Sequence, residues 1–130
     1  VLEKNRGKVI YFDFWARWCP PCLAEMEPLK QLRSKFSTDD LIIYSICVSE
    51  PKEQWEECLN EYSLKNRGIE CVHVTDYLGI DNYQKIRKQW KIDRMPYYVL
   101  INRKGQIIDF GTAARPSNPQ LVSRIEEAVK

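Results

Sequence analysis

The chain has 130 residues, 44% of them hydrophobic and 29% charged, which is the balance of a single globular domain with a hydrophobic core. Its net charge is only +2, both signs are mixed along the chain, and no block of basic residues stands out, so we expect no nucleic-acid partner. The longest uncharged apolar stretch covers residues 41–48, far short of the ~20 residues that span a membrane.

The first part of the chain predicts strands alternating with helices. Residues 9–15 are apolar, β-branched and aromatic, with Asp13 as the one acid, and indicate a buried central strand. Apolar residues at three- and four-residue spacing predict a helix over residues 20–36, which Pro28 should bend because proline removes one helical hydrogen bond. Residues 41–48 predict a second buried strand.

The middle of the chain predicts two further helices and a short strand. A helix over residues 51–66 would place its apolar side chains on one face and stop before a glycine. Residues 70–74 are a short strand candidate. Asp81 and Gln84 form the expected N-cap pair of the next helix.

The last third predicts a hairpin and a closing helix. Residues 97–101 and 106–110 are the expected strands, and the connection 102–105 ends in glycine, which is a hairpin signal. Asn118 and Pro119 should cap and start the final helix. The order β-α-β-α-β-α-β-β-α predicts an α/β fold in which parallel strands with right-handed crossovers are closed by an antiparallel edge.

Two of the five cysteines, Cys19 and Cys22, stand three positions apart between the first strand and the first helix. Disulfide exchange uses two thiols delivered to the start of a helix in this way. A permanent disulfide or a pair of inert core thiols is the alternative. A disulfide that closes so short a loop would constrain little of the unfolded chain and so add little stability. We expect Cys47, Cys58 and Cys71 to be small buried hydrophobes, although a Cys58–Cys71 bond stays open.

The only histidine, His73, is expected on the surface of its strand, and it lies far from Cys19 and Cys22 in the sequence. A structural zinc site usually takes four ligands at tighter spacing. We therefore expect neither a metal nor another cofactor.

The start of the first helix should activate Cys19. With Cys19 at the N-cap, Pro20 and Pro21 fill the next two positions without an N–H, so Cys22 supplies the first backbone donor that can reach the Cys19 sulfur. This donor and the positive end of the helix favour the thiolate, which is the attacking species. Cys19 would attack a disulfide of the partner, and Cys22 would then resolve the mixed disulfide.

Residues 13–22, Asp-Phe-Trp-Ala-Arg-Trp-Cys-Pro-Pro-Cys, and the Met95-Pro96 step before the hairpin resemble the thioredoxin-like superfamily. The resemblance covers nearly the whole chain and implies a thioredoxin fold, with a central mixed sheet flanked by helices on both faces. The extra helix and strand within residues 51–74 resemble the insert of the TlpA-like branch, whose members are extracytoplasmic thiol:disulfide oxidoreductases, often tethered to the membrane. We expect residues 1–130 to be one domain with this insert, and part of a longer precursor.

The resemblance implies roles for two acids. Asp13 would accept the proton of Cys22, and burial should raise its pKa. An acid on an exposed strand end is the alternative. Glu25 lies about one helical turn beyond Cys22 and would tune the site, as a glutamate at this spacing does in members that serve cytochrome maturation. An ordinary solvated helix charge is equally expected there.

The resemblance also outlines a substrate groove. Met95 and Pro96 match the family's cis-proline step, where backbone groups of Met95 would pair with an extended substrate. A trans proline that opens a strand is the alternative. Trp18 would form an exposed aromatic rim and Gly111 would let a partner backbone approach, with simple packing and a bare turn glycine as the alternatives. Tyr97 stands where the family commonly has threonine, so the groove is expected to differ in shape.

The expected function is a thiol:disulfide oxidoreductase that reduces protein disulfides through transient mixed disulfides and draws on an upstream electron donor. The expected location is extracytoplasmic, in the periplasm, with a membrane tether as one option. Two alternatives stay open: a cytosolic, tryparedoxin-like donor to peroxidases, and a redox-silent binding module on the same fold. A signal peptide or anchor ahead of Val1 would exclude the cytosolic alternative.

Overall fold

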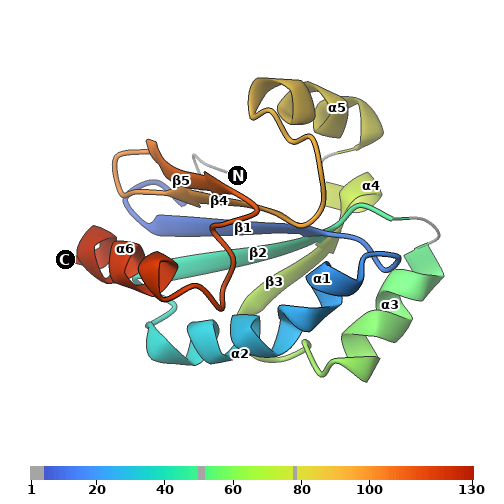
Figure 1. Ribbon diagram of the computed structural model, residues 1–130, viewed down its shortest axis with the longest axis horizontal. Helices are drawn as coiled ribbons and strands as arrows, with labels where there is room; N and C mark the ends of the chain where they lie inside the picture. Colours follow the sequence, from blue (N-terminus) through green and yellow to red (C-terminus); the bar gives the residue numbers. More distant parts are fainter. Residues whose placement is uncertain (1–4, 50–51, 78) are drawn as a thin grey trace.

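The computed structural model describes residues 5–49, 52–77 and 79–130, with residues 76, 77 and 80 described by their backbone alone. In chain order the elements are β1 (Val9–Trp15), α1 (Pro20–Ala24), α2 (Met26–Lys35), β2 (Leu41–Cys47), α3 (Lys52–Glu61), β3 (Ile69–His73), α4 (Val74–Tyr77), α5 (Ile80–Gln89), β4 (Tyr97–Ile101), β5 (Ile107–Gly111) and α6 (Pro119–Val129). The described strands form one sheet in the order β3-β2-β1-β4-β5, with β1 at its centre (Figure 1).

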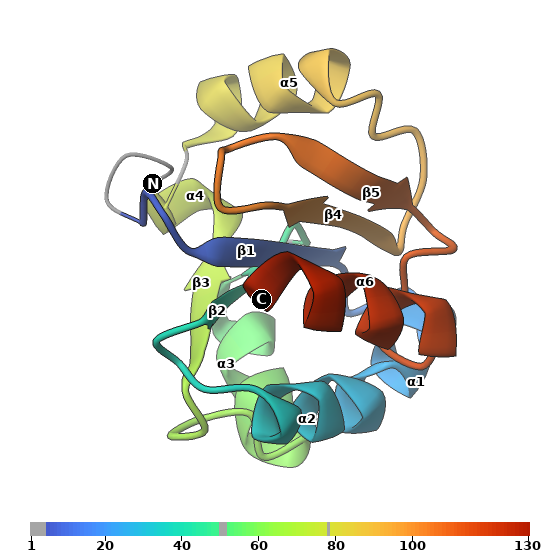
Figure 2. The same ribbon diagram turned by 90° about the vertical axis from the view of Figure 1, so that its left-hand side faces the viewer.

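The sheet is mixed and covered on both faces. β1 pairs in parallel with β2 and antiparallel with β4, while β3 extends the parallel side and β5 the antiparallel side. Helices α1, α2, α3 and α6 lie on one face, and α5 lies on the other (Figure 1, Figure 2). This is the predicted arrangement, including the extra helix and strand, α3 and β3, in the middle of the chain.

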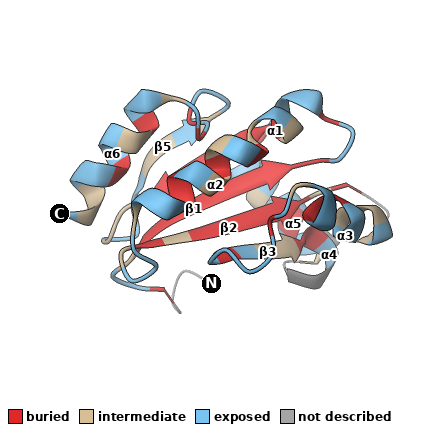
Figure 3. Cartoon of the chain, turned by 90° about the horizontal axis from the view of Figure 1, so that it is seen from below, coloured by how far each residue is buried: buried red, intermediate tan, exposed pale blue. Residues whose placement is uncertain are grey.

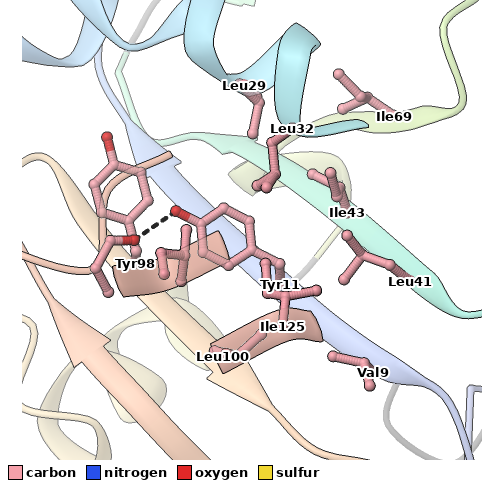
Figure 4. Close-up of a cluster of buried hydrophobic side chains, with 12 residues drawn as sticks. Val9, Tyr11, Leu29, Leu32, Leu41, Ile43, Ile69, Tyr98, Leu100 and Ile125 are labelled. Atoms are coloured by element: carbon pink, nitrogen blue, oxygen red, sulfur yellow. Dashed lines mark hydrogen bonds between the residues drawn. The ribbon is translucent and has the colours of Figure 1, made fainter. Parts of the chain in front are cut away.

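β1 is buried along its whole length, as its apolar sequence predicts (Figure 3). Successive side chains of a strand point to opposite faces of the sheet. On one face Tyr11 packs in a cluster with Leu29 of α2 and Ile125 of α6, and its ring stacks on Tyr98 of β4 at 5.8 Å between centroids (Figure 4). The Tyr11 hydroxyl donates to the carbonyl oxygen of Ala114 at 2.6 Å, which satisfies the polar end of this ring.

On the other face, aromatic rings attach α5 and the residue after it to the sheet. The ring of Phe12 lies 5.5 Å from that of Trp90, and the ring of Phe14 lies 6.2 Å from that of Tyr83, measured between centroids. Such ring pairs stabilise a core beyond the area they bury. β1 is therefore held from both faces, and its carboxyl end presents the following residues at a fixed place.

The helix predicted over residues 20–36 is broken into α1 and α2 at Glu25, three residues before Pro28. Pro28 has no N–H for the carbonyl of Ala24, and its ring displaces that carbonyl. The Glu25 N–H instead closes the last turn of α1 on the carbonyl oxygen of Cys22 at 3.1 Å, and α2 begins at Met26. A proline acts on the turn before it, and so the bend lies nearer the cysteines than Pro28 itself.

Two predicted helix boundaries were wrong, each because of a backbone turn. α3 ends at Glu61 instead of residue 66, since Ser63 adopts a φ of 54° and the Leu64 N–H turns back to the carbonyl oxygen of Leu59. α5 begins at Ile80, with Gly79 at the N-cap and no side-chain cap hydrogen bond. Asp81 thus lies within the first turn and does not cap the helix. The short helix α4 was not predicted.

The predicted hairpin and the final cap are confirmed. The Asn102 N–H donates to the carbonyl oxygen of Gln106 at 2.9 Å across the loop, whose Gly105 has a φ of 82°. At the start of α6 the Asn118 side chain accepts a hydrogen bond from the Gln120 N–H at 3.0 Å.

The prediction that His73 lies on the surface was wrong, because its ring is fully buried. Nδ1 lies 2.7 Å from the Thr75 hydroxyl and Nε2 lies 2.7 Å from the carbonyl oxygen of Ser49, so both ring nitrogens have partners. Hydrogen bonding of this kind removes the usual penalty for burying a polar ring.

Cys47 and Cys58 are buried and Cys71 is partly buried, and all three are free thiols, so the Cys58–Cys71 bond is not formed. Within the described ranges, no group of three or more His, Cys, Asp and Glu side chains is arranged to hold a metal ion. None of the helices in those same ranges combines the length and the apolar character of a membrane crossing.

Candidate active site

The cysteine pair lies at the start of α1, four residues after the end of β1. Cys19 is the N-cap residue with extended backbone, and Pro20 and Pro21 follow at the first two helical positions. The Cys22 N–H donates to Cys19 Sγ at 3.3 Å, as predicted from the two prolines. The two sulfurs are joined by a disulfide, and both residues are almost fully buried, with exposed fractions of 4% and 2%.

Asp13 is buried within β1, on the cysteine side of the strand's midpoint. Its backbone neighbours across the sheet are Ser45 of β2 and Tyr98 of β4, and only 3% of the residue is exposed. Burial, and to a smaller extent the negative charge of Glu25, raise its pKa to about 8. The predicted upward shift is confirmed, and the alternative of an acid on an exposed strand end is wrong.

Glu25 lies at the break between α1 and α2, and two hydrogen bonds hold its carboxylate in place. One oxygen accepts the Ser117 N–H at 2.9 Å and the other accepts the Ser117 hydroxyl at 2.8 Å. The break therefore places the carboxylate of Glu25 against the loop before α6, close enough for its charge to act on Asp13. A fully solvated glutamate would neither accept hydrogen bonds from Ser117 nor affect the pKa of Asp13.

The Met95-Pro96 peptide bond is cis, as predicted. Pro96 is buried, and its carbonyl oxygen accepts a hydrogen bond from the Thr112 hydroxyl at 2.9 Å. Met95 is half-buried and packs against the cluster that contains Cys19 and Cys22. Met95 and the cysteine pair thus belong to one packed region although some seventy positions separate them in the sequence.

The three other predicted groove residues lie in different surroundings. Trp18 is 69% exposed next to Cys19, as expected of a rim. Gly111 is the last residue of β5, with a φ of 98° and no atom within 4 Å of the place where a Cβ would be, so the space around it is open. Tyr97 is buried instead, and its hydroxyl donates to the carbonyl oxygen of Trp90 at 2.7 Å, so it can shape a groove only through packing.

A groove of about 330 Å³ runs from Trp18 along α5, and we call it the α5 groove. Its lining residues are Trp18, Val48, Tyr83, Gln84, Arg87, Ile92, Asp93, Arg94 and Met95. Sequence reasoning identified only the first and the last of these. Ile92, Asp93 and Arg94 belong to the segment after α5, which runs to the end of the sheet where α1 begins (Figure 1).

Sequence reasoning also missed Ser117 and Tyr98. Ser117 holds Glu25 from a distance of 92 positions. The buried Tyr98 hydroxyl has no hydrogen-bond partner among the described residues, and Tyr98 pairs with Asp13 across the strands. Burial, and then the charge of Asp13, raise the pKa of Tyr98. Neither residue belongs to a local motif, so only the strand pairing and the tertiary contact reveal them.

A helix that begins at a cysteine pair directly after the central strand of a mixed sheet defines the thioredoxin-like class of proteins. A sequence profile of the Redoxin family matches residues 1–129, and the chain therefore belongs to this family. Its relatives place it in the TlpA-like branch of the thioredoxin-like superfamily.

Three similar proteins illustrate the relationship. The thiol-disulfide oxidoreductase ResA of Bacillus thuringiensis is 26% identical over 108 residues, which are 83% of this chain and 57% of ResA. A structure described as a candidate thiol-disulfide oxidoreductase from Bacteroides vulgatus is 32% identical, with a TM-score of 0.74 over 97% of this chain and 76% of that one. A structure described as a candidate DsbE-type thiol:disulfide interchange protein from Chlorobium tepidum shares the fold, with 20% identity and a TM-score of 0.78 over 99% and 85% of the two chains. The chain thus spans little more than half the length of ResA.

We expect the replacement Asp13→Asn to stabilise the oxidised protein at alkaline pH. Between the ordinary pKa of 3.8 and the raised pKa of about 8, the unfolded chain has released this proton while the folded chain keeps it. The wild type therefore loses stability as pH rises, by up to ~1.4 kcal/mol per pH unit relative to the variant.

Urea unfolding at acid, neutral and alkaline pH measures this difference. Asp39→Asn, at an exposed position, is the matched control and should unfold like the wild type at each pH. A difference between Asp13→Asn and wild type that does not change with pH would contradict the burial of an uncharged carboxyl group.

Proposed function

We propose that this chain is the redox domain of a thiol:disulfide oxidoreductase that reduces protein disulfides through Cys19 and Cys22. The observation that carries the proposal is the hydrogen bond from the Cys22 N–H to Cys19 Sγ at the first turn of α1. In the reduced protein the same donor and the positive end of the helix would stabilise a thiolate on Cys19. The names of the relatives, which are thiol-disulfide oxidoreductases, support this chemistry.

The reaction would proceed in two exchange steps. The Cys19 thiolate attacks one sulfur of the partner disulfide, so that a mixed disulfide forms and the other partner sulfur leaves as a thiolate. Cys22 then attacks Cys19 Sγ, which releases the second partner thiol and forms the Cys19–Cys22 disulfide. Two electrons pass to the partner, and an upstream electron donor must reduce the chain again.

Asp13 is suited to receive the proton that Cys22 loses in the second step. Its pKa of about 8 lies close to the ~8.5 of a free thiol, and so proton transfer between the two groups is nearly balanced in free energy. A carboxyl group with an ordinary pKa would be a much weaker base. Glu25 would tune this step through its charge, which helps to hold the pKa of Asp13 high.

The substrate would bind beside the cysteines as an extended segment. The cis peptide before Pro96 leaves the backbone of Met95 available for strand-like pairing, and Trp18 forms an exposed apolar rim. The open space at Gly111 would admit a partner backbone, while Tyr97 supports the groove from within the core.

We further propose that residues 1–130 form one domain of a longer, extracytoplasmic precursor, in the periplasm and with a membrane tether as one option. The similarity to the TlpA-like branch supports this, as does the fact that ResA extends well beyond the matched part. A cytosolic donor to peroxidases would use the same chemistry, and the amino terminus of the full-length gene distinguishes the two.

Replacing Cys19 with Ser should reduce the rate of insulin reduction with dithiothreitol to the rate without protein, because the variant loses the thiol at the start of α1 that accepts the Cys22 N–H. Cys22→Ser should instead accumulate mixed disulfides that gel electrophoresis resolves without reductant. Cys71→Ala is the matched control, because it removes a free cysteine outside the pair. A Cys19→Ser variant as fast as the wild type would refute the proposal, and an empty Cys22→Ser trap in cell extracts would favour a redox-silent binding module.

The direction of electron flow follows from the redox potential. We expect equilibration with glutathione buffers to give a midpoint potential below about −220 mV, beneath the poise of an oxidising compartment. Quantifying free thiols at each glutathione ratio measures it. A potential near that of the strong oxidant DsbA, about −120 mV, would reverse the proposed direction and leave the exchange chemistry intact.

A further inference from the structure

The α5 groove is lined by both apolar and charged side chains. Trp18, Val48, Ile92 and Met95 are apolar, Arg87 and Arg94 are basic, and Asp93 is its one acid. Of the apolar residues, Trp18 is mostly exposed and adjoins the cysteine pair. An exposed tryptophan beside a hollow is the kind of surface that binds an apolar side chain of a partner.

The two arginines remain largely available to a ligand. Arg87 is fixed by a hydrogen bond from its Nε to the carbonyl oxygen of Ile92 at 3.1 Å, which leaves a full positive charge without an acidic partner in the described contacts. Arg94 lies 3.5 Å from Asp93, but both side chains are about 70% exposed. An exposed pair of this kind contributes little free energy and opens readily.

The stretch of sequence that contributes most of the groove is basic. Residues 84–94 contain five basic residues and a single acid, so this segment carries a formal charge of +4 while the whole chain carries only +2. The basic residues are Lys85, Arg87, Lys88, Lys91 and Arg94, and the acid is Asp93. Of these five basic residues, Arg87 and Arg94 line the groove, so the groove itself holds two basic residues against one acid.

We propose that the α5 groove binds an acidic segment of the partner protein, in which a bulky apolar side chain and a carboxylate lie within about two residues of the reacting cysteine. The proposal rests on the proposed function and adds a substrate class to it. The apolar side chain would cover Trp18 and Met95, and the carboxylate would meet Arg87 and Arg94. Alternate side chains of an extended segment point the same way, so both can face the groove at once.

Two synthetic peptides test this proposal. Each carries a leucine next to a cysteine that is held as a mixed disulfide with 2-mercaptoethanol, and they differ only in a Glu or a Lys two positions from the cysteine. The reduced protein would convert each to the peptide thiol and 2-mercaptoethanol, and would itself become the Cys19–Cys22 disulfide. Quenched-flow sampling and chromatography give both rates.

We expect the Glu peptide to react about 3- to 10-fold faster than the Lys peptide at low salt, because opposite charges speed the encounter. High salt should bring the two rates together, since it screens exposed charges. In the double variant Arg87→Gln, Arg94→Gln the ratio of the two rates should fall close to one. The ratio is informative even if a variant loses activity overall.

Lys88→Gln is the matched control, because Lys88 lies on α5 next to Arg87 but does not line the groove. It should keep most of the preference for the Glu peptide. Equal rates with both peptides in the wild type, or an unchanged preference in the double variant, would overturn the proposal. A second copy of the chain in the groove is the other outcome, and a dimer in sedimentation that the double variant abolishes would also overturn it.

Reduction of neutral 2-hydroxyethyl disulfide separates this proposal from the proposed function. A wild type that reduces this compound but shows no preference between the peptides lacks the acidic-segment specificity and keeps the redox activity. A wild type that cannot reduce the compound lacks the redox activity, and the groove proposal then fails with it.

Discussion

The hydrogen bond from the Cys22 N–H to Cys19 Sγ is the contact on which the rest of the site depends. It requires α1 to begin at Cys19, and the two prolines ensure that Cys22 offers the first free donor. It also requires β1 to end at a fixed place, which its complete burial between two layers of helices provides. Sheet, helix start and reactive sulfur are thus one connected arrangement.

We propose that two carboxyl groups, those of Asp13 and Glu25, act together near this sulfur. Burial, and to a smaller extent the charge of Glu25, raise the pKa of Asp13 to about 8, which suits the proposed exchange of a proton with a thiol. Glu25 is anchored by Ser117 in the loop before α6, which connects the carboxyl-terminal part of the chain to the candidate active site. The break that Pro28 causes is what places Glu25 there.

The sequence predicts most of this fold because β1 and β2 are continuous apolar runs, β4 and β5 flank a turn that ends in glycine, α2 has apolar residues at helical spacing, and α6 begins with a capping asparagine. The prediction from sequence fails where a single backbone turn sets the end of a helix, as at Ser63 and Gly79. It also fails where the burial of a side chain depends on partners distant in the sequence, as for His73. The cysteine pair, Asp13 and the cis-proline step are local motifs and were predicted. Ser117, Tyr98 and the α5 groove arise only from tertiary contacts, which local patterns do not encode.

The most direct test of the account is the rate at which iodoacetamide alkylates Cys19 in the reduced protein, followed across pH. We predict a first inflection well below the ~8.5 of a free thiol, from the helix-stabilised thiolate, and a second near 8 that is absent in Asp13→Asn. A single inflection at the value of an unstructured thiol, unchanged in the variant, would contradict the account.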